Sequence, residues 1–167
     1  PTTAGTGSEV TPYSILTDMN LQTKRNLRSE KLFPVLAYLD PRYTELLPRD
    51  ITSYTAIDAL THAIEGYLSS RHTPLTDVLA LESIRLLGEK LPGLSRSLPD
   101  SSGREKLLMA SLLAGIVIAR TGTTVLHAMG YHLTFFHKVE HGRANGFLLP
   151  AYLEYVAGAQ AERVQTV

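Results

Sequence analysis

The spacing of hydrophobic residues changes near Pro41 and divides the chain into two parts. After Pro41, apolar residues recur every three or four positions, which predicts amphipathic helices. The first of these helices has Asp50 or Thr52 as its N-cap. Its apolar positions are Ile57, Leu60, Ile64 and Leu68.

Further helices follow the same spacing. One starts at Thr73-Pro74, a cap followed by proline, and is interrupted by Pro92-Gly93. Another spans 104–120 behind a Ser101 or Ser102 cap; its second half is apolar nearly all round, which is typical of a helix in the centre of a bundle. Gly122 ends it, and two more helices are predicted over 124–137 and 141–158.

Residues 1–41 show strand and loop patterns instead. The segment EVTPYSILTD (9–18) predicts a strand ending in a turn, and PVLAYLD (34–40) predicts a second strand. Because a two-stranded ribbon alone is marginally stable in water, we expect these strands to belong to a larger sheet. The expected fold is therefore mainly α, with a short β-ribbon in front of the helices.

Composition excludes several classes of protein. Lys and Arg together number 16, as do Asp and Glu, so the net charge of zero argues against a nucleic-acid or anionic-membrane partner. The absence of cysteine excludes disulfides and thiolate metal sites. The longest apolar run, LLAGIVIA (112–119), is far shorter than the roughly 20 residues of a spanning helix. With no signal-peptide pattern visible, a cytoplasmic location is expected.

Asp58 and His62 are the first candidates for chemistry. They lie four residues apart, so on a helix both side chains leave the same face, among apolar neighbours. A carboxylate there costs several kcal/mol unless it is paired or bound to a cation. Two interpretations remain open: a two-point metal site, or an intrahelical Asp–His hydrogen bond on a half-exposed face.

A second group of histidines lies nearer the C-terminus. Its members are His127, His132, His137 and His141. Two of them, with Asp58 and His62, would provide three imidazoles and one carboxylate, a set that suits Fe(II), Zn(II) or Mn(II). Spacing does not tell which two, and each one alone is more typical of an ordinary surface or core histidine. His72 lies in a polar loop, where a solvated side chain is expected.

The opening segment PTTAGTG is rich in glycine and hydroxyl groups. Gly5 and Gly7 permit close backbone approach, and the threonines and Ser8 offer hydroxyls, as a phosphate or ribose contact requires. The alternative is a turn that connects strands. The segment is neither a G-x-G-x-x-G fingerprint nor a P-loop.

Taken in order, five motifs resemble the iron-dependent (group III) alcohol dehydrogenases, which have the dehydroquinate synthase-like fold. These are PTTAGTGSEVT, TD…K, LDP, DALTHAIEGYLS and LHAMGYHLT…HGRANGFLLP, which together cover residues 1 to about 155. In that family an N-terminal α/β domain binds NAD(P), a helical domain holds a divalent metal, and the active site lies between them.

The resemblance implies a role for individual residues. It assigns as metal ligands Asp58, His62, His127 and His141. It assigns to the cofactor Thr2, Thr3, Thr6, Ser8 and Lys24. Ile118 and Tyr131 would line the substrate pocket, while His132 and His137 fall outside the ligand pattern. The implied cofactors are Fe²⁺, with Zn²⁺ as the alternative, and NAD(P).

The family also implies a reaction and a domain division. The expected reaction is metal-assisted hydride transfer between a primary alcohol or diol, or its aldehyde, and NAD(P). Residues 1–41 would be the end of the cofactor domain and 42–167 most of the metal domain, so the chain is expected to be a fragment. Ala56-Ile57 and Tyr131 depart from usual family residues, which bears on substrate preference. The alternatives are a metal-binding helical module without turnover, or a zinc polyol dehydrogenase; a homo-oligomer is also expected.

Overall fold

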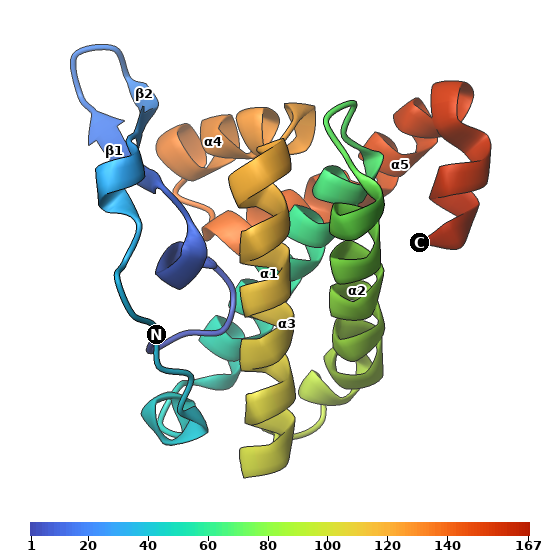
Figure 1. The fold of residues 1–167 in the computed structure, drawn as a ribbon. Coiled ribbons are helices and arrows are strands. Elements are labelled where there is room, and N and C mark those ends of the chain that lie inside the picture. Colours follow the sequence, from blue (N-terminus) through green and yellow to red (C-terminus); the bar gives the residue numbers. More distant parts are fainter.

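The computed structural model describes residues 1–167 and is built mainly from five helices (Figure 1). They are α1 (Arg49–Leu68), α2 (Pro74–Leu94), α3 (Ser101–Thr121), α4 (Val125–His137) and α5 (His141–Thr166). The only sheet pairs β1 (Tyr13–Asp18) with β2 (Thr23–Arg28) in antiparallel register, from Tyr13 opposite Arg28 to Asp18 opposite Thr23. The predicted mainly α fold with a short β-ribbon is confirmed.

The N-terminal strand predictions were partly wrong. The first strand forms as expected, but its partner is Thr23–Arg28 and not the apolar segment 34–40, where Val35 and Leu36 are exposed. The hairpin has two strands and joins no larger sheet. β2 was not predicted, because most of its side chains are exposed and its sequence shows no alternation of apolar and polar residues. Formation of a homo-oligomer stays a prediction.

Helix ends follow local chemistry, with some corrections. Thr73 caps α2 through the backbone N–H of Thr76, and Gly122 ends α3 with a φ of 69°, as predicted. α1 begins earlier than expected, after Pro48, and the cap of α3 is Asp100 rather than a serine. Pro92 lies within the last turn of α2, which continues to Leu94.

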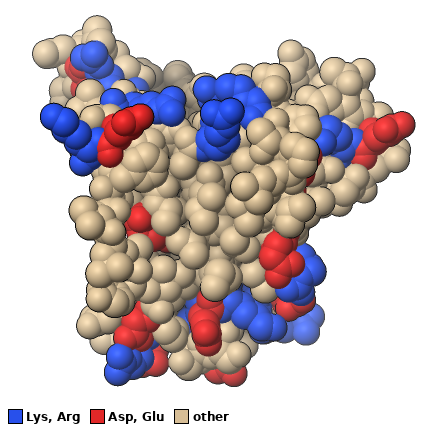
Figure 2. Space-filling model, in the orientation of Figure 1, with Lys and Arg blue, Asp and Glu red and all other residues tan.

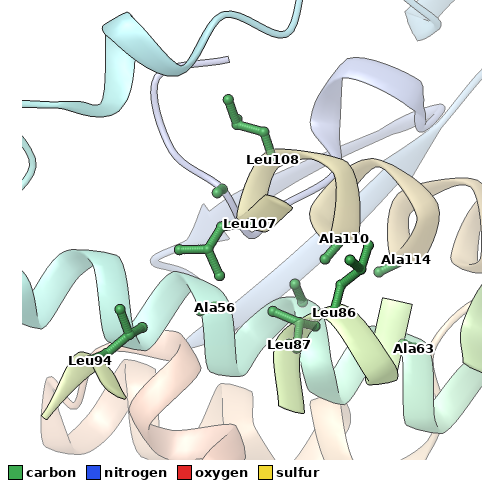
Figure 3. Close-up of a cluster of buried hydrophobic side chains, with 11 residues drawn as sticks. Ala56, Ala63, Leu86, Leu87, Leu94, Leu107, Leu108, Ala110 and Ala114 are labelled. Atoms are coloured by element: carbon green, nitrogen blue, oxygen red, sulfur yellow. The ribbon is translucent and has the colours of Figure 1, made fainter. Parts of the chain in front are cut away.

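The main core lies where α1, α2 and α3 pack side by side (Figures 1 and 3). α1 contributes small residues at helical spacing: Ala56, Ala59 and Ala63, all completely buried. Leucines of α2 and α3 fill the remaining space: Leu86, Leu87, Leu94, Leu107 and Leu108. Each such leucine contributes roughly 2 kcal/mol of hydrophobic free energy. α3 is not fully enclosed, because Met109 and Ile116 remain partly exposed.

α5 packs on α1 and α4 and completes the layer that carries the candidate site. A second apolar cluster joins all five helices, through residues that include Ile64, Ala80, Val117, Leu126 and Tyr152. The hairpin and the C-terminal end of α5 lie on opposite sides of the bundle (Figure 1). Basic and acidic side chains are mixed on the face in Figure 2, and much of its middle carries neither.

No single helix is long and apolar enough to cross a membrane. α3 and α4 meet that standard only when taken together, and they are bent against each other by 110°.

Candidate metal centre

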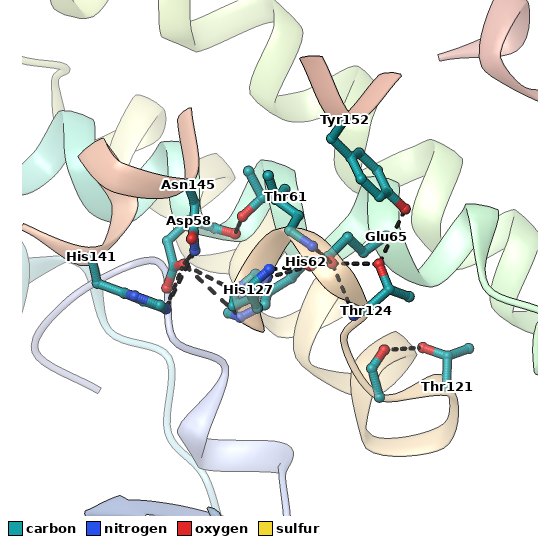
Figure 4. A network of polar contacts seen from close by, with 12 residues as sticks. Asp58, Thr61, His62, Glu65, Thr121, Thr124, His127, His141, Asn145 and Tyr152 are labelled. Atoms are coloured by element: carbon teal, nitrogen blue, oxygen red, sulfur yellow. Dashed lines mark hydrogen bonds and ion pairs between the residues drawn. The ribbon is translucent and has the colours of Figure 1, made fainter. Parts of the chain in front are cut away.

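Three helices bring one carboxylate and three imidazoles to a single point (Figure 4). α1 provides Asp58 and His62, the start of α4 provides His127, and the first residue of α5 is His141. Asp58 Oδ1 lies 3.4 Å from Nε2 of His127, 3.6 Å from Nε2 of His141 and 4.0 Å from Nε2 of His62. Ligand atoms of Asp58, His62 and His127 all lie within 4.8 Å of one another. The fourth ligand implied by the family resemblance, His141, approaches this group at Asp58 Oδ1.

Asp58, His62 and His127 each offer one ligand atom to a divalent ion. Ligand atoms at about 2.1 Å from one ion, in tetrahedral directions, lie about 3.4 Å from one another. The separations from Asp58 Oδ1 to His127 and His141 are close to that value, while His62 Nε2 lies farther away, at 4.0 Å. His127 Nε2 is buried and has no hydrogen-bond partner, so it is free to bind an ion once its proton is released. Mixed imidazole and carboxylate ligands suit Fe(II), Zn(II) and Mn(II).

The alternative interpretation of Asp58 and His62 was a hydrogen bond within α1. The 4.0 Å between His62 Nε2 and Asp58 Oδ1 is too long for one. Both side chains are also only 7% exposed, so the face is buried rather than half-exposed. The buried carboxylate is instead next to Asn145 and His127, and a bound cation is the other way to compensate its charge.

Two further polar residues of the centre lie within the sequence motifs but were not predicted as site residues. Asn145 is completely buried, and its side-chain amide donates to Asp58 Oδ1 at 3.1 Å. Glu65 is also completely buried, and its carboxylate accepts a hydrogen bond from His127 Nδ1. Helical spacing was the available signal, because Glu65 lies three residues after His62 and Asn145 four residues after His141.

The ionisable groups of the centre shift one another's pKa values. Burial by itself would raise the pKa of Asp58, but the surrounding imidazoles outweigh it and hold that pKa well below its ordinary value. Burial lowers the pKa of His62 to about 4. For His127, burial is outweighed by the neighbouring carboxylates of Asp58 and Glu65, and its pKa rises to about 9. In the absence of metal, the positively charged imidazolium of His127 thus lies between two carboxylates.

These pKa values predict that the metal-free chain is most stable near pH 6.5. An unfolded histidine has a pKa of about 6.5. Between pH 4 and 6.5 the folded chain holds fewer protons on His62 than the unfolded chain, so the free energy of unfolding rises with pH. Between pH 6.5 and 9 it holds more protons on His127, so that free energy falls by a few kcal/mol.

Urea unfolding of the chelator-treated chain at pH 5, 6.5 and 9 measures this dependence. The control is His127→Gln, which should abolish the decrease above pH 6.5. A free energy of unfolding that keeps rising to pH 9 in the unsubstituted chain would contradict the assignment.

A cavity of about 540 Å³ opens beside the centre. Its lining includes five of the residues predicted for cofactor and substrate: Thr6, Ser8, Lys24, Ile118 and Tyr131. Tyr131 stacks on His141 with ring centroids 5.5 Å apart. Arg28 and Arg71, which were not predicted, also line it. Thr2 lies in a different hollow, beside residues 34–43, and Thr3 lines neither.

The glycines of the opening loop pack closely against the backbones of α1 and α3. A Cβ on Gly7, whose φ is 59°, would lie 2.5 Å from the Cα of Gly115 in α3. A Cβ on Gly5 would collide with the backbone of Thr55 in α1. The loop is therefore seated on both helices, and Thr6 and Ser8, whose hydroxyl oxygens are 2.9 Å apart, face the cavity.

The other histidines do not join the centre. His132 packs on Phe136, with ring centroids 4.7 Å apart, and His137 lies near it at the end of α4. His72 was expected to be solvated, but it contacts the Asp77 carboxylate at 3.1 Å through Nδ1. These positions agree with the ligand set that the resemblance implies, which stays a prediction.

Comparison with known families gives two matches that together cover most of the chain. Residues 52–167 match the family described as "Fe-containing alcohol dehydrogenase family, C-terminal". Residues 1–41 match the family described as "Iron-containing alcohol dehydrogenase".

Individual relatives agree with these matches. The protein named "Probable alcohol dehydrogenase EutG" from Escherichia coli (strain K12) is 41% identical over 155 residues, which are 93% of this chain and 39% of that protein. The NAD-dependent methanol dehydrogenase of Bacillus methanolicus is 33% identical over 97% of this chain and 42% of its own length. The crystal structure of an iron-containing alcohol dehydrogenase from Thermotoga maritima superposes with a TM-score of 0.92 and is 48% identical, over 99% of this chain and 45% of that one. The chain thus spans less than half the length of these relatives.

Proposed function

The chain belongs to the iron-containing alcohol dehydrogenase family, and from that premise we propose that it holds the catalytic metal of an NAD(P)-dependent alcohol dehydrogenase. The reaction is hydride transfer between a primary alcohol or diol, or its aldehyde, and NAD(P). The observation that carries the proposal is the convergence of three imidazole nitrogens on Asp58 Oδ1 at 3.4–4.0 Å, beside a cavity.

The proposed ligands are Asp58, His62, His127 and His141. A divalent ion held by them supplies a Lewis acid for an alcohol or carbonyl oxygen, and hydride transfer is the chemistry of the nicotinamide. Asp58 contributes the negative charge of the set, and the Asn145 amide steadies the carboxylate through its hydrogen bond. Ile118 and Tyr131 form part of the wall against which a small substrate would pack.

The cofactor side of the cavity is the opening loop with the hairpin. Hydroxyls of Thr6 and Ser8 and the ammonium group of Lys24 line it, and these groups suit a ribose and phosphates. Lys24 Nζ donates to Thr17 Oγ1 at 2.8 Å, which positions the ammonium group on the ribbon. Thr2 and Thr3 stay in the proposal as cofactor residues, although neither of them lines this cavity.

The division into residues 1–41 and 42–167 is part of the same proposal. The hairpin and opening loop would belong to the cofactor domain, and the five helices to the metal domain. The family matches support this division, because one match ends at residue 41 and the other begins at residue 52.

Metal titration followed by an activity assay tests the proposal. We expect the 167-residue chain to bind one Fe(II) or Zn(II) per molecule, detected by calorimetry and metal analysis. The loaded chain is then assayed for NAD⁺ and NADP⁺ reduction with short primary alcohols and diols. Turnover would support the dehydrogenase, and binding without turnover would favour the metal-binding module. Binding no metal would reject both, and activity restricted to zinc and polyols would favour a polyol dehydrogenase.

A further inference from the structure

Glu65 is a carboxylate in the interior of the protein, on α1, one turn beyond His62. It is completely buried, and a buried carboxylate costs several kcal/mol unless its oxygens are paired. All of its hydrogen-bond donors lie on one element, the start of α4. The side chain therefore connects the helix that carries Asp58 and His62 with the helix that carries His127.

One oxygen of Glu65 acts as the cap of α4. Its Oε1 accepts from the backbone N–H of Thr124 at 2.8 Å, of Leu126 at 3.1 Å and of His127 at 3.4 Å. It also accepts from the Thr124 hydroxyl at 2.5 Å. Thr124 provides no side-chain cap of its own. Glu65 thus satisfies N–H groups that the first turn leaves free, where a negative charge is favourable.

The other oxygen of Glu65 holds the imidazole of His127. Oε2 accepts from Nδ1, which assigns the proton to that nitrogen (Figure 4). Nε2 then lies 3.4 Å from Asp58 Oδ1 with no hydrogen-bond partner. A metal-binding histidine commonly donates its second ring N–H to a carboxylate, which fixes its tautomer and orientation.

We propose that Glu65 is a positioning residue for the metal centre, which holds the His127 ring with Nε2 directed at the ion while capping the helix that carries it. The inference rests on the proposed metal site. The competing explanation is that Glu65 only caps α4, in which case metal affinity would follow helix stability alone. If Glu65 has both roles, a variant can lose metal affinity without an equal loss of helix stability.

The matched variants are Glu65→Gln and Thr124→Val. Glutamine keeps the size and an oxygen that accepts backbone N–H groups, but removes the charge next to Nδ1. Valine at 124 removes one hydrogen bond of the cap and leaves the His127–Glu65 contact in place. We expect Zn(II) or Co(II) affinity to fall 10- to 100-fold in E65Q and to stay within threefold of the unsubstituted chain in T124V.

Two readouts separate positioning from folding. The visible spectrum of the Co(II)-loaded chain should shift in E65Q and stay unchanged in T124V, while thermal unfolding of both metal-free variants reports helix stability. In the Zn(II)-loaded unsubstituted chain, NMR should find a slowly exchanging proton on Nδ1 of His127. This last measurement requires no variant and holds even if E65Q does not fold.

The outcomes separate the inference from the proposed function. An unsubstituted chain that binds no metal overturns both. A chain that binds metal while E65Q binds it with the same affinity and spectrum overturns only the role of Glu65. Metal binding through Nδ1 of His127, with the proton on Nε2, also overturns that role.

Discussion

Replacing His127 with alanine is expected to lower the affinity of the chain for Fe(II) or Zn(II) by more than about 100-fold. Four-ligand zinc sites bind with roughly 10–16 kcal/mol, so one ligand corresponds to about 3 kcal/mol. His127 is also the only imidazole of the set with a carboxylate next to each ring nitrogen. Its loss therefore removes the contacts with both Asp58 and Glu65. Competition with a chromogenic chelator measures the change.

His132→Ala is the matched control for His127→Ala. Both residues lie on α4, but His132 packs on Phe136 and is exposed, away from the centre. The control should bind metal as the unsubstituted chain does. Equal metal content in the two variants would refute the ligand assignment.

The second large effect is expected from Gly142→Ala, which should destabilise the fold by about 3 kcal/mol and lower Tm by about 6–12 °C. α5 approaches α1 so closely at Gly142 that a Cβ would collide with the carbonyl oxygen of Tyr54 and lie 3.3 Å from the Cβ of Asp58. A backbone atom cannot rotate away, so the helices must separate. His141 and Asn145 lie on the displaced turn, so metal affinity should fall as well.

Gly88→Ala is the control for this substitution. Gly88 is exposed within α2, and a Cβ added there would meet no atom within 4 Å, so alanine should stabilise the chain by about 1 kcal/mol. Thermal unfolding of both variants, with and without Zn(II), provides the comparison. Similar Tm values for the two variants would show that α5 does not approach α1 so closely.

Much of the helical architecture was predictable because its signals are local. Thr73-Pro74 places a hydroxyl where it accepts from Thr76 N–H, and Gly122 adopts a positive φ. The prediction failed where exposure removes the hydrophobic pattern, as in β2, or where an apolar segment forms no strand, as in 34–40. Glu65 and Asn145 were overlooked because their partners lie 62 and 87 positions away in the chain.

By itself the sequence determined that Asp58 and His62 leave one face of a helix, because four residues make little more than one turn. It also determined the family, through motifs in a characteristic order. Spacing left open which of the four later histidines join the pair. Only the tertiary structure brings His127 and His141 to Asp58 and directs His132 away, because distances between helices depend on packing between remote residues, such as Gly142 against Tyr54.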